Sequence, residues 1–174
     1  EFRRVLFRSM GSGKTAVGRV LARLRGQRFI DADAEIERRT GVDIPFIFEQ
    51  EGEAGFRERE QAVIDDLTRW QGIVLATGGG AVTRPENRDC LRRRGVVIYL
   101  QASVAQQVER TQHSRHRPLL QTADPAARLA DLMAVREPLY RSTAHLMVAT
   151  DRRKVAAVAE AIMEGLVGLG AVTR

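Results

Sequence analysis

A short run of glycine, lysine and threonine near the N-terminus has the composition of a phosphate-binding turn. The run is Gly11-Ser12-Gly13-Lys14-Thr15, and a helical pattern follows it directly. Glycines let backbone N–H groups wrap around phosphates, the helix N-terminus attracts negative charge, and the lysine reaches the β- and γ-phosphates. The threonine hydroxyl is a suitable ligand for Mg²⁺. The run is typical of the second half of a P-loop, although a plain glycine-rich turn before an amphipathic helix stays open.

Two further sets of charged residues could act on a small substrate. Asp31 and Asp33 follow a short apolar segment, and carboxylates two positions apart at a strand end can project into one crevice. Arg57 precedes Glu60 by one helical turn. Each set has a plainer interpretation: Asp33 could cap the next helix, and Arg57 could form an exposed intrahelical ion pair with Glu60. Spacing alone leaves these alternatives open.

Three consecutive glycines at 78–80 follow the apolar run at 73–76. Glycine loses more conformational freedom on folding than any other residue, so a triplet is costly. It is explained where a ligand must approach the backbone closely. We therefore expect a ligand to lie against this turn.

The segments that must position these residues alternate between strand and helix patterns. Apolar runs predict strands at 29–30, 73–76, 96–100 and 145–150. Helical spacing predicts a helix at 14–25 and another that follows Asp33 and runs to about 41. It predicts further helices at 45–51, 52–69, 85–94, 103–111, 125–141 and 154–169. In the first helix the expected buried face is Val17, Val20, Leu21 and Leu24, and Pro138 is expected to kink or end its helix. The alternation predicts one α/β domain with helices on both faces of a parallel sheet.

Composition excludes several classes of protein. The 174 residues fit one domain, and the single cysteine cannot form an internal disulfide. The net charge of +6 is spread over many segments, and aromatic residues make up only 5%, which argues against a nucleic-acid partner. No apolar stretch is long enough to span a bilayer. We expect a cytoplasmic protein with a small anionic substrate and no membrane partner.

The first nine residues, EFRRVLFRS, match the translation of a widely used short-read sequencing adapter. We expect residues 1–9 to be foreign sequence that replaces the first strand, with native sequence from near Met10. They are apolar enough at 5–7 to fill a central strand. A complete P-loop has glycine where this chain has Arg8, and we assign that departure to the foreign segment. An ordinary arginine-rich first strand is the alternative.

Six short segments, in this order and spacing, resemble shikimate kinase from Met10 nearly to the C-terminus. They are GSGKT (11–15), DADAEIERRTG (31–41), EGEAGFRERE (51–60), TGGGAV (77–82), RPLL (117–120) and REPLY (136–140). The resemblance implies a P-loop three-layer α/β/α fold with five parallel strands in the order 2-3-1-4-5. It also implies a single domain over 10–174, with a lid at about 112–124.

The resemblance implies that ATP and Mg²⁺ act together on the 3-hydroxyl of shikimate. The residues that would bind ATP are Gly11, Ser12, Gly13, Lys14, Thr15 and Ala16, with Arg110, Arg117 and Arg153. Thr15 and Asp31 would hold the metal. The residues that would bind shikimate are Asp33, Arg57, Gly79, Gly80 and Arg136. The implied catalytic residues are Lys14, Asp33, which would orient or deprotonate the hydroxyl, and Arg117, which would stabilise the transferring phosphoryl group.

Two alternative functions stay open at this point. Another small-molecule or nucleoside monophosphate kinase of the same fold, such as a gluconate kinase, would share the phosphate-binding turn. The feature that we weigh against it is the pair Arg57 and Arg136 together with Asp33, which suits a carboxylated polyol. A nucleotide-binding protein without catalysis is the second alternative, and the altered N-terminus could impair this chain in the same way. A monomer is expected in either case.

Overall fold

The computed structural model describes residues 4–8, 13–111 and 124–170, and for 4–8 and 110–111 it describes the backbone alone. The described residues form a parallel sheet of five strands in the order β2-β3-β1-β4-β5. The strands are β1 (Arg4–Arg8), β2 (Arg28–Asp31), β3 (Ile73–Ala76), β4 (Val96–Gln101) and β5 (Leu146–Ala149). The predicted alternation of strands and helices is confirmed.

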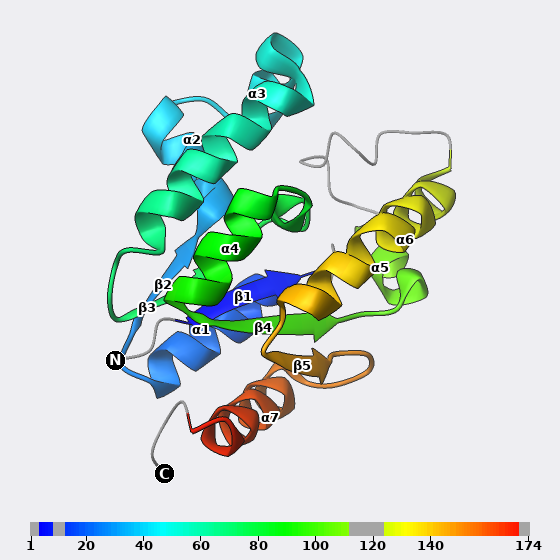
Figure 1. Ribbon diagram of the computed structural model, residues 1–174. Coiled ribbons are helices and arrows are strands. Elements are labelled where there is room, and N and C mark those ends of the chain that lie inside the picture. The colour runs from blue at the N-terminus through cyan, green and yellow to red at the C-terminus, as the bar shows by residue number, and fades with distance from the viewer. Residues whose placement is uncertain (1–3, 9–12, 112–123, 171–174) are drawn as a thin grey trace.

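Helices cover both faces of this sheet (Figure 1). In chain order they are α1 (Lys14–Leu24), α2 (Ala32–Thr40), α3 (Ile44–Leu67), the 3₁₀ turn η1 (Ala81–Thr83), α4 (Pro85–Arg94), α5 (Val104–Thr111), α6 (Pro125–Thr143) and α7 (Val155–Gly168). α1 and α7 lie side by side on one face, and α2, α3, α4 and α6 lie on the other. Parallel strands joined by helices require this arrangement, because each crossover places its helix over a face of the sheet.

Each face has its own hydrophobic core. Ile36 of α2, Ile64 of α3 and Tyr140 of α6 belong to the first core. Leu21 of α1 and Ile162 of α7 belong to the second core. All five side chains are almost completely buried. The two cores hold the sheet between them and fix which loops meet at its edges.

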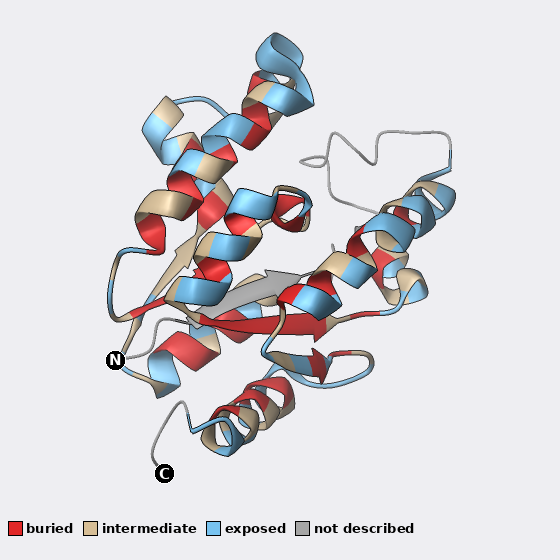
Figure 2. Cartoon of the chain, in the orientation of Figure 1, coloured by how far each residue is buried: buried red, intermediate tan, exposed pale blue. Residues whose placement is uncertain are grey.

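The central strands contribute alternate residues to the two cores. On β3, Val74 packs in the second core and Leu75 in the first; on β4, Ile98 packs in the second core and Val97 in the first. β4 is buried along almost its whole length (Figure 2). The continuous apolar runs in the sequence are therefore strands that face protein on both sides.

Residues 4–8 form the central strand, and they include the apolar residues 5–7 that were expected to fill it. The backbone of β1 pairs with β3 on one side, where Val5 lies opposite Leu75, and with β4 on the other, where Val5 lies opposite Val97. Arg8 is the last residue of the strand and lies opposite Leu100. The segment at 1–9 is therefore joined to the sheet through its middle residues.

The expected buried face of the first helix is wrong at its end. Leu24, the last residue of α1, is exposed, and the buried residues of α1 are Val17, Gly18, Leu21 and Ala22. Pro138 was expected to kink or end its helix; it does not end it, because α6 continues to Thr143. The lost hydrogen bond at proline is tolerated where buried residues on either side hold the helix in place.

One boundary between helices is hidden in the long α3. Gly52 lies inside it with non-helical angles (φ 69°, ψ −174°), so the expected break between 45–51 and 52–69 is present. A positive φ of this kind favours glycine. None of the helices in the described part of the chain is long and apolar enough to cross a membrane.

Candidate active site

The phosphate-binding lysine meets the two aspartates at the carboxyl end of β2. Lys14 is the first residue of α1, and its Nζ lies 3.6 Å from Asp31 Oδ2 and 3.6 Å from Asp33 Oδ2. Thr15 Oγ1 donates to Asp31 Oδ2 over 3.5 Å. All of these groups lie where a ligand binds in an open parallel sheet, beyond the carboxyl ends of the strands. The four residues therefore form one polar cluster.

The two aspartates differ in their local role. Asp31 is the N-cap of α2, and its Oδ1 accepts from the backbone N–H of Asp33 over 3.0 Å. The expectation that Asp33 could be the cap is therefore wrong, because α2 begins directly after β2 and Asp33 already lies in its first turn. The carboxylate of Asp33 is about one-third exposed and is available to a ligand.

The glycine turn after β3 lies against these carboxylates. A Cβ at Gly78 would lie 3.0 Å from Glu60 Oε1 and 3.2 Å from Asp33 Oδ1. A Cβ at Gly80 would lie 2.0 Å from Arg57 Nη2. A side chain at Gly80 would require the buried guanidinium of Arg57 to move, and one at Gly78 would press on the carboxylates of Glu60 and Asp33. The glycine turn thus brings Asp33 and the α3 pair of Arg57 and Glu60 to one place.

Arg57 and Glu60 form an ion pair within α3, but the pair is buried. Arg57 Nη1 donates to Glu60 Oε2 over 2.7 Å, and the Glu60 side chain is fully inaccessible to solvent. The alternative of an exposed pair is therefore wrong. The other edge of the guanidinium contacts Glu53, with Nε and Nη2 donating to Oε1 over 3.3 and 3.1 Å.

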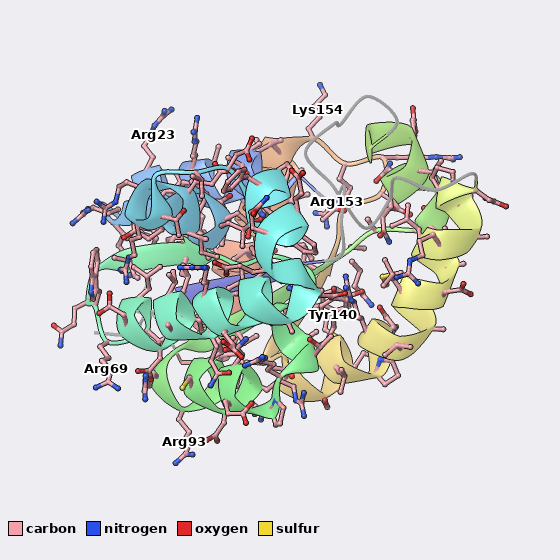
Figure 3. All side chains as sticks on the ribbon, turned by 90° about the horizontal axis from the view of Figure 1, so that it is seen from above. Arg23, Arg69, Arg93, Tyr140, Arg153 and Lys154 are labelled. Atoms are coloured by element: carbon pink, nitrogen blue, oxygen red, sulfur yellow. The ribbon has the colours of Figure 1, made fainter. Side chains whose placement is uncertain are left out.

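Arg136 reaches the same region from α6. It is buried, and its guanidinium is hydrogen-bonded to the hydroxyl of Tyr140. That hydroxyl donates to the carbonyl oxygen of Gly79 over 2.5 Å. Tyr140 lies in the interior of the molecule, whereas Arg23 and Arg69 point outward from its edge (Figure 3). α6 is thereby joined to the glycine turn at the position of its arginine.

Burial and charge act together on the titratable groups of this cluster. Burial raises the pKa of Glu60 to about 7, and Asp33 adds to the rise while Arg57 opposes it. Burial alone would lower the pKa of Arg57, but the adjacent Glu60 and Glu53 outweigh it and the net shift is upward. Burial lowers the pKa of Arg136, and the charge of Arg57 lowers it further. The two arginines are therefore close enough to repel each other.

Several residues expected in the site are placed elsewhere or lie outside the described part. Arg153 donates to the backbone oxygens of Ala149 and Ala157, so its guanidinium joins the end of β5 to α7. Ala16 is exposed within α1. Arg110 lies in α5 without a described side chain, and Gly11, Ser12, Arg117 and the expected lid, except for Asp124, lie outside the described residues. Asp124 is the N-cap of α6.

The donor set at the start of α1 fits a nucleotide with a bound divalent cation. Gly13 has a left-handed conformation (φ 81°) and precedes the first turn of the helix, which offers backbone N–H groups to an anion. Lys14 adds a positive charge there. The hydroxyl oxygen of Thr15 and a carboxylate oxygen of Asp31 are the hard oxygen ligands that Mg²⁺ prefers, and Mg²⁺ keeps several of its waters.

Three residues of the cluster were not assigned a role from the sequence. They are Glu53, Glu60 and Tyr140. Glu60 lies four positions after Phe56 and three before Val63, so all three share one face of the helix. Helical spacing predicts that Phe56, Val63 and Ile64 are buried, and they are. This pattern was the signal that Glu60 also faces inward. Nothing local indicated the contact of Tyr140 with Gly79.

Comparisons with known proteins agree with this geometry. A family model for shikimate kinase matches residues 10–167. The chain is 58% identical over 159 residues to a shikimate kinase of Halorhodospira halophila, which covers 91% of this chain and 90% of that relative. The solved structure of a shikimate kinase from Acinetobacter baumannii in complex with shikimate matches with a TM-score of 0.93 at 45% identity, covering 99% of this chain and 96% of that one.

A gluconokinase structure from Sinorhizobium meliloti matches with a TM-score of 0.61 at 18% identity, over 97% of this chain and 93% of that one, and shares the fold alone. The high identity over nearly the whole length distinguishes the first group of matches from this one. The chain belongs to the shikimate kinase family, whose members are phosphotransferases that use ATP with Mg²⁺.

Proposed function

We propose that the cluster around Asp33 is the site at which this chain transfers a phosphoryl group from ATP to the 3-hydroxyl of shikimate. One observation supports this most strongly. The carboxylate of Asp33 lies 3.6 Å from Lys14 on one side and beside Gly78 and Glu60 on the other. Asp33 therefore stands between a phosphate-binding group and a buried arginine site.

Lys14, Thr15 and Asp31 form the nucleotide side of the proposed site. Lys14 and the backbone amides of 11–16 bind the phosphates of ATP, and the amides act with the dipole of α1. Thr15 and Asp31 hold Mg²⁺, Asp31 through water. When bound, Mg²⁺ neutralises the charge that develops on the transferring phosphoryl group. Binding of the nucleotide draws Lys14 away from the two aspartates.

Arg57 and Arg136 form the substrate side. Both guanidinium groups are buried, and each can donate two parallel hydrogen bonds to a carboxylate. Gly79 and Gly80 lie on the adjoining turn and offer backbone N–H groups to shikimate and to the γ-phosphate. A pair of arginines suits a carboxylated polyol. Gluconate also carries a carboxylate, so the preference for shikimate over the gluconate kinase-like alternative is supported by the family match and by the much higher identity to shikimate kinases than to the gluconokinase.

Asp33 is the group that acts on the reacting hydroxyl. Its carboxylate accepts a hydrogen bond from the 3-hydroxyl of shikimate, orients its oxygen toward the phosphoryl group and takes the proton as the bond forms. Arg117 stabilises the charge on the phosphoryl group from the lid at 112–124, and closure of the lid excludes water. Arg110 and Arg153 flank the adenine or ribose. Arg153 must then exchange its backbone contacts for the nucleotide.

We further propose that the fold is the P-loop kinase arrangement of three layers and that the chain acts as a monomer. The strand order β2-β3-β1-β4-β5 and the helices on both faces support the first point. We also propose that residues 1–9 are foreign to the native domain at 10–174. The family match that begins at residue 10 supports this. Reading the junction in the nucleotide sequence tests it directly.

A coupled assay of ADP release, with and without shikimate, tests the proposed function. We expect release to depend on shikimate and Mg²⁺ and to fall by a factor of roughly 10² to 10⁴ in Asp33→Asn, since general-base catalysis contributes about that much. Asp43→Asn is the matched control, because Asp43 is also an aspartate near a helix N-terminus but caps α3. ADP release that is independent of shikimate in the wild-type chain would contradict the assignment.

A further inference from the structure

Both edges of the Arg57 guanidinium are occupied by carboxylates of this chain. Nη1 donates to Glu60 on one edge, and Nε and Nη2 donate to a single oxygen of Glu53 on the other. The Nε and Nη2 edge is one of the edges of arginine that forms two parallel bonds to a carboxylate. A bound carboxylate ligand and Glu53 therefore need the same two donors.

The two glutamates are held very differently. Glu60 is fully buried, so separating it from Arg57 would leave an unpaired charge inside the protein. The side chain of Glu53 is 48% exposed and can move into water. Glu53 follows Gly52, where the helical angles are interrupted, and it lies one turn before Arg57. A rotation about its side-chain bonds would carry its carboxylate into solvent. Glu60 is a fixed partner of Arg57, and Glu53 is an exchangeable one.

Glu53 supplies one of the negative charges that face the two buried arginines. Its charge helps to raise the pKa of Arg57 and partly offsets the lowering of the pKa of Arg136. An incoming carboxylate that replaces Glu53 supplies the same charge at the Nε and Nη2 edge, whereas a neutral ligand that replaced Glu53 would remove it.

We propose that Glu53 determines the affinity of the site for its substrate, by occupying the Nε and Nη2 edge of Arg57 as an internal competitor that the substrate carboxylate must displace. This rests on the proposed function, in which Arg57 binds the carboxylate of shikimate. Glu53 keeps the buried arginines compensated before the substrate arrives. It lowers the affinity for shikimate by the free energy of its own contact.

Glu51 provides a matched control on the same helix. It is also a partly exposed glutamate paired with an arginine, Arg59, over 2.5 and 2.8 Å. Glu51→Gln removes one negative charge from the same helix without touching Arg57, so it measures the general effect of charge on an anionic ligand. Glu53→Asp keeps the charge but shortens the side chain by one methylene, so it weakens the contact.

Calorimetric titration with shikimate in the absence of nucleotide tests the proposal without relying on the phosphate-binding turn beside residues 1–9. We expect Glu53→Gln to lower the Kd roughly threefold to fivefold, the upper part of the range for an exposed ion pair. Glu53→Asp should shift it in the same direction, and Glu51→Gln should stay within about twofold of wild type at the same ionic strength. Unchanged or weaker binding in Glu53→Gln, or an equal gain in Glu51→Gln, would overturn the proposal.

Acetate is a second probe, which separates this inference from the proposed function. Its binding is followed by the NMR signal of the Arg57 Nε–H group. We expect saturation at a lower acetate concentration in Glu53→Gln than in wild type, whether or not shikimate binds. Equal acetate affinities in the two proteins would overturn the role of Glu53. If Glu53→Gln binds acetate more tightly than wild type but wild type does not bind shikimate, only the proposed substrate is overturned.

Discussion

The hydroxyl of Tyr140 donates a hydrogen bond to the carbonyl oxygen of Gly79 over 2.5 Å, although 61 positions separate the two residues. The same hydroxyl is hydrogen-bonded to Arg136. One buried phenol therefore connects the arginine of α6 to the glycine turn after β3. The geometry of the proposed substrate site depends on this connection.

Tyr140→Phe removes the hydroxyl and keeps the ring, which stacks on Tyr99 with ring centroids 4.8 Å apart. We expect the free energy of unfolding to fall by about 1 kcal/mol and the KM for shikimate to rise several-fold, because Arg136 and Gly79 lose their common partner. The KM for ATP should not change. Denaturant unfolding and steady-state kinetics measure these effects.

Tyr99→Phe is the control for Tyr140→Phe. Tyr99 donates to Glu137 and shares the stack, but it does not contact Gly79. It should therefore lower stability without a comparable change in the KM for shikimate. Equal kinetic effects in the two variants would show that stability, and not the bond to Gly79, determines the result.

Arg57→Lys keeps the positive charge but cannot form two parallel bonds to a carboxylate while it also contacts Glu60. We expect the KM for shikimate to rise about tenfold or more, the loss of one charge-assisted hydrogen bond, with little change in the KM for ATP. Arg59→Lys on the exposed face of α3 is the control and should behave like wild type. A change confined to the KM for ATP would remove Arg57 from the substrate site.

Glu60 should make stability depend on pH between about 5 and 8. Its pKa in the folded chain is about 7, against an ordinary value of 4.5, and the groups that face it are Arg57, Asp33 and Arg136. Because the folded state binds the proton more tightly, the stabilisation is fully present below pH 4.5 and is lost as the pH rises through 7. The loss amounts to roughly 3 kcal/mol for a shift of this size.

Glu60→Gln removes this titration. Urea unfolding of the two proteins at several pH values should show the stability of wild type falling toward pH 8 relative to the variant, while titrations elsewhere cancel in the difference. Parallel curves for the two proteins would mean that Glu60 has the same pKa in the folded and unfolded chains.

Arg8→Gly tests the effect of the segment at 1–9 that we propose to be foreign. Arg8 ends β1 where a complete P-loop begins with glycine, and a residue with a Cβ there can strain the turn by about 1 to 3 kcal/mol. The positive charge of arginine would attract phosphate, but the turn binds through several amides that must all be aimed correctly. We expect a lower KM for ATP and a higher kcat in Arg8→Gly, most clearly when the native first strand is also restored. Equal kinetic constants would show that the glycine is dispensable here.

The order of the elements and the phosphate-binding turn could be predicted from local sequence patterns. The apolar run at 96–100 became β4, the run at 73–76 became β3, and the helix at 85–94 was placed with its ends. Lys14 and Thr15 stand at the start of α1 as expected. Periodicity, capping and glycine content act over a few residues, so these features can be read locally.

The burial of charged side chains and the contacts between distant residues could not be predicted in this way. Arg57 and Glu60 have the spacing of a surface pair, and only the packing of α3 against α2 and the glycine turn buries them. The contact of Tyr140 with Gly79 depends on how α6 is placed relative to the glycine turn. Asp31 caps α2 because that helix begins without a loop after β2. Burial and contact over long separations arise from the arrangement of all the layers together, which no local pattern specifies.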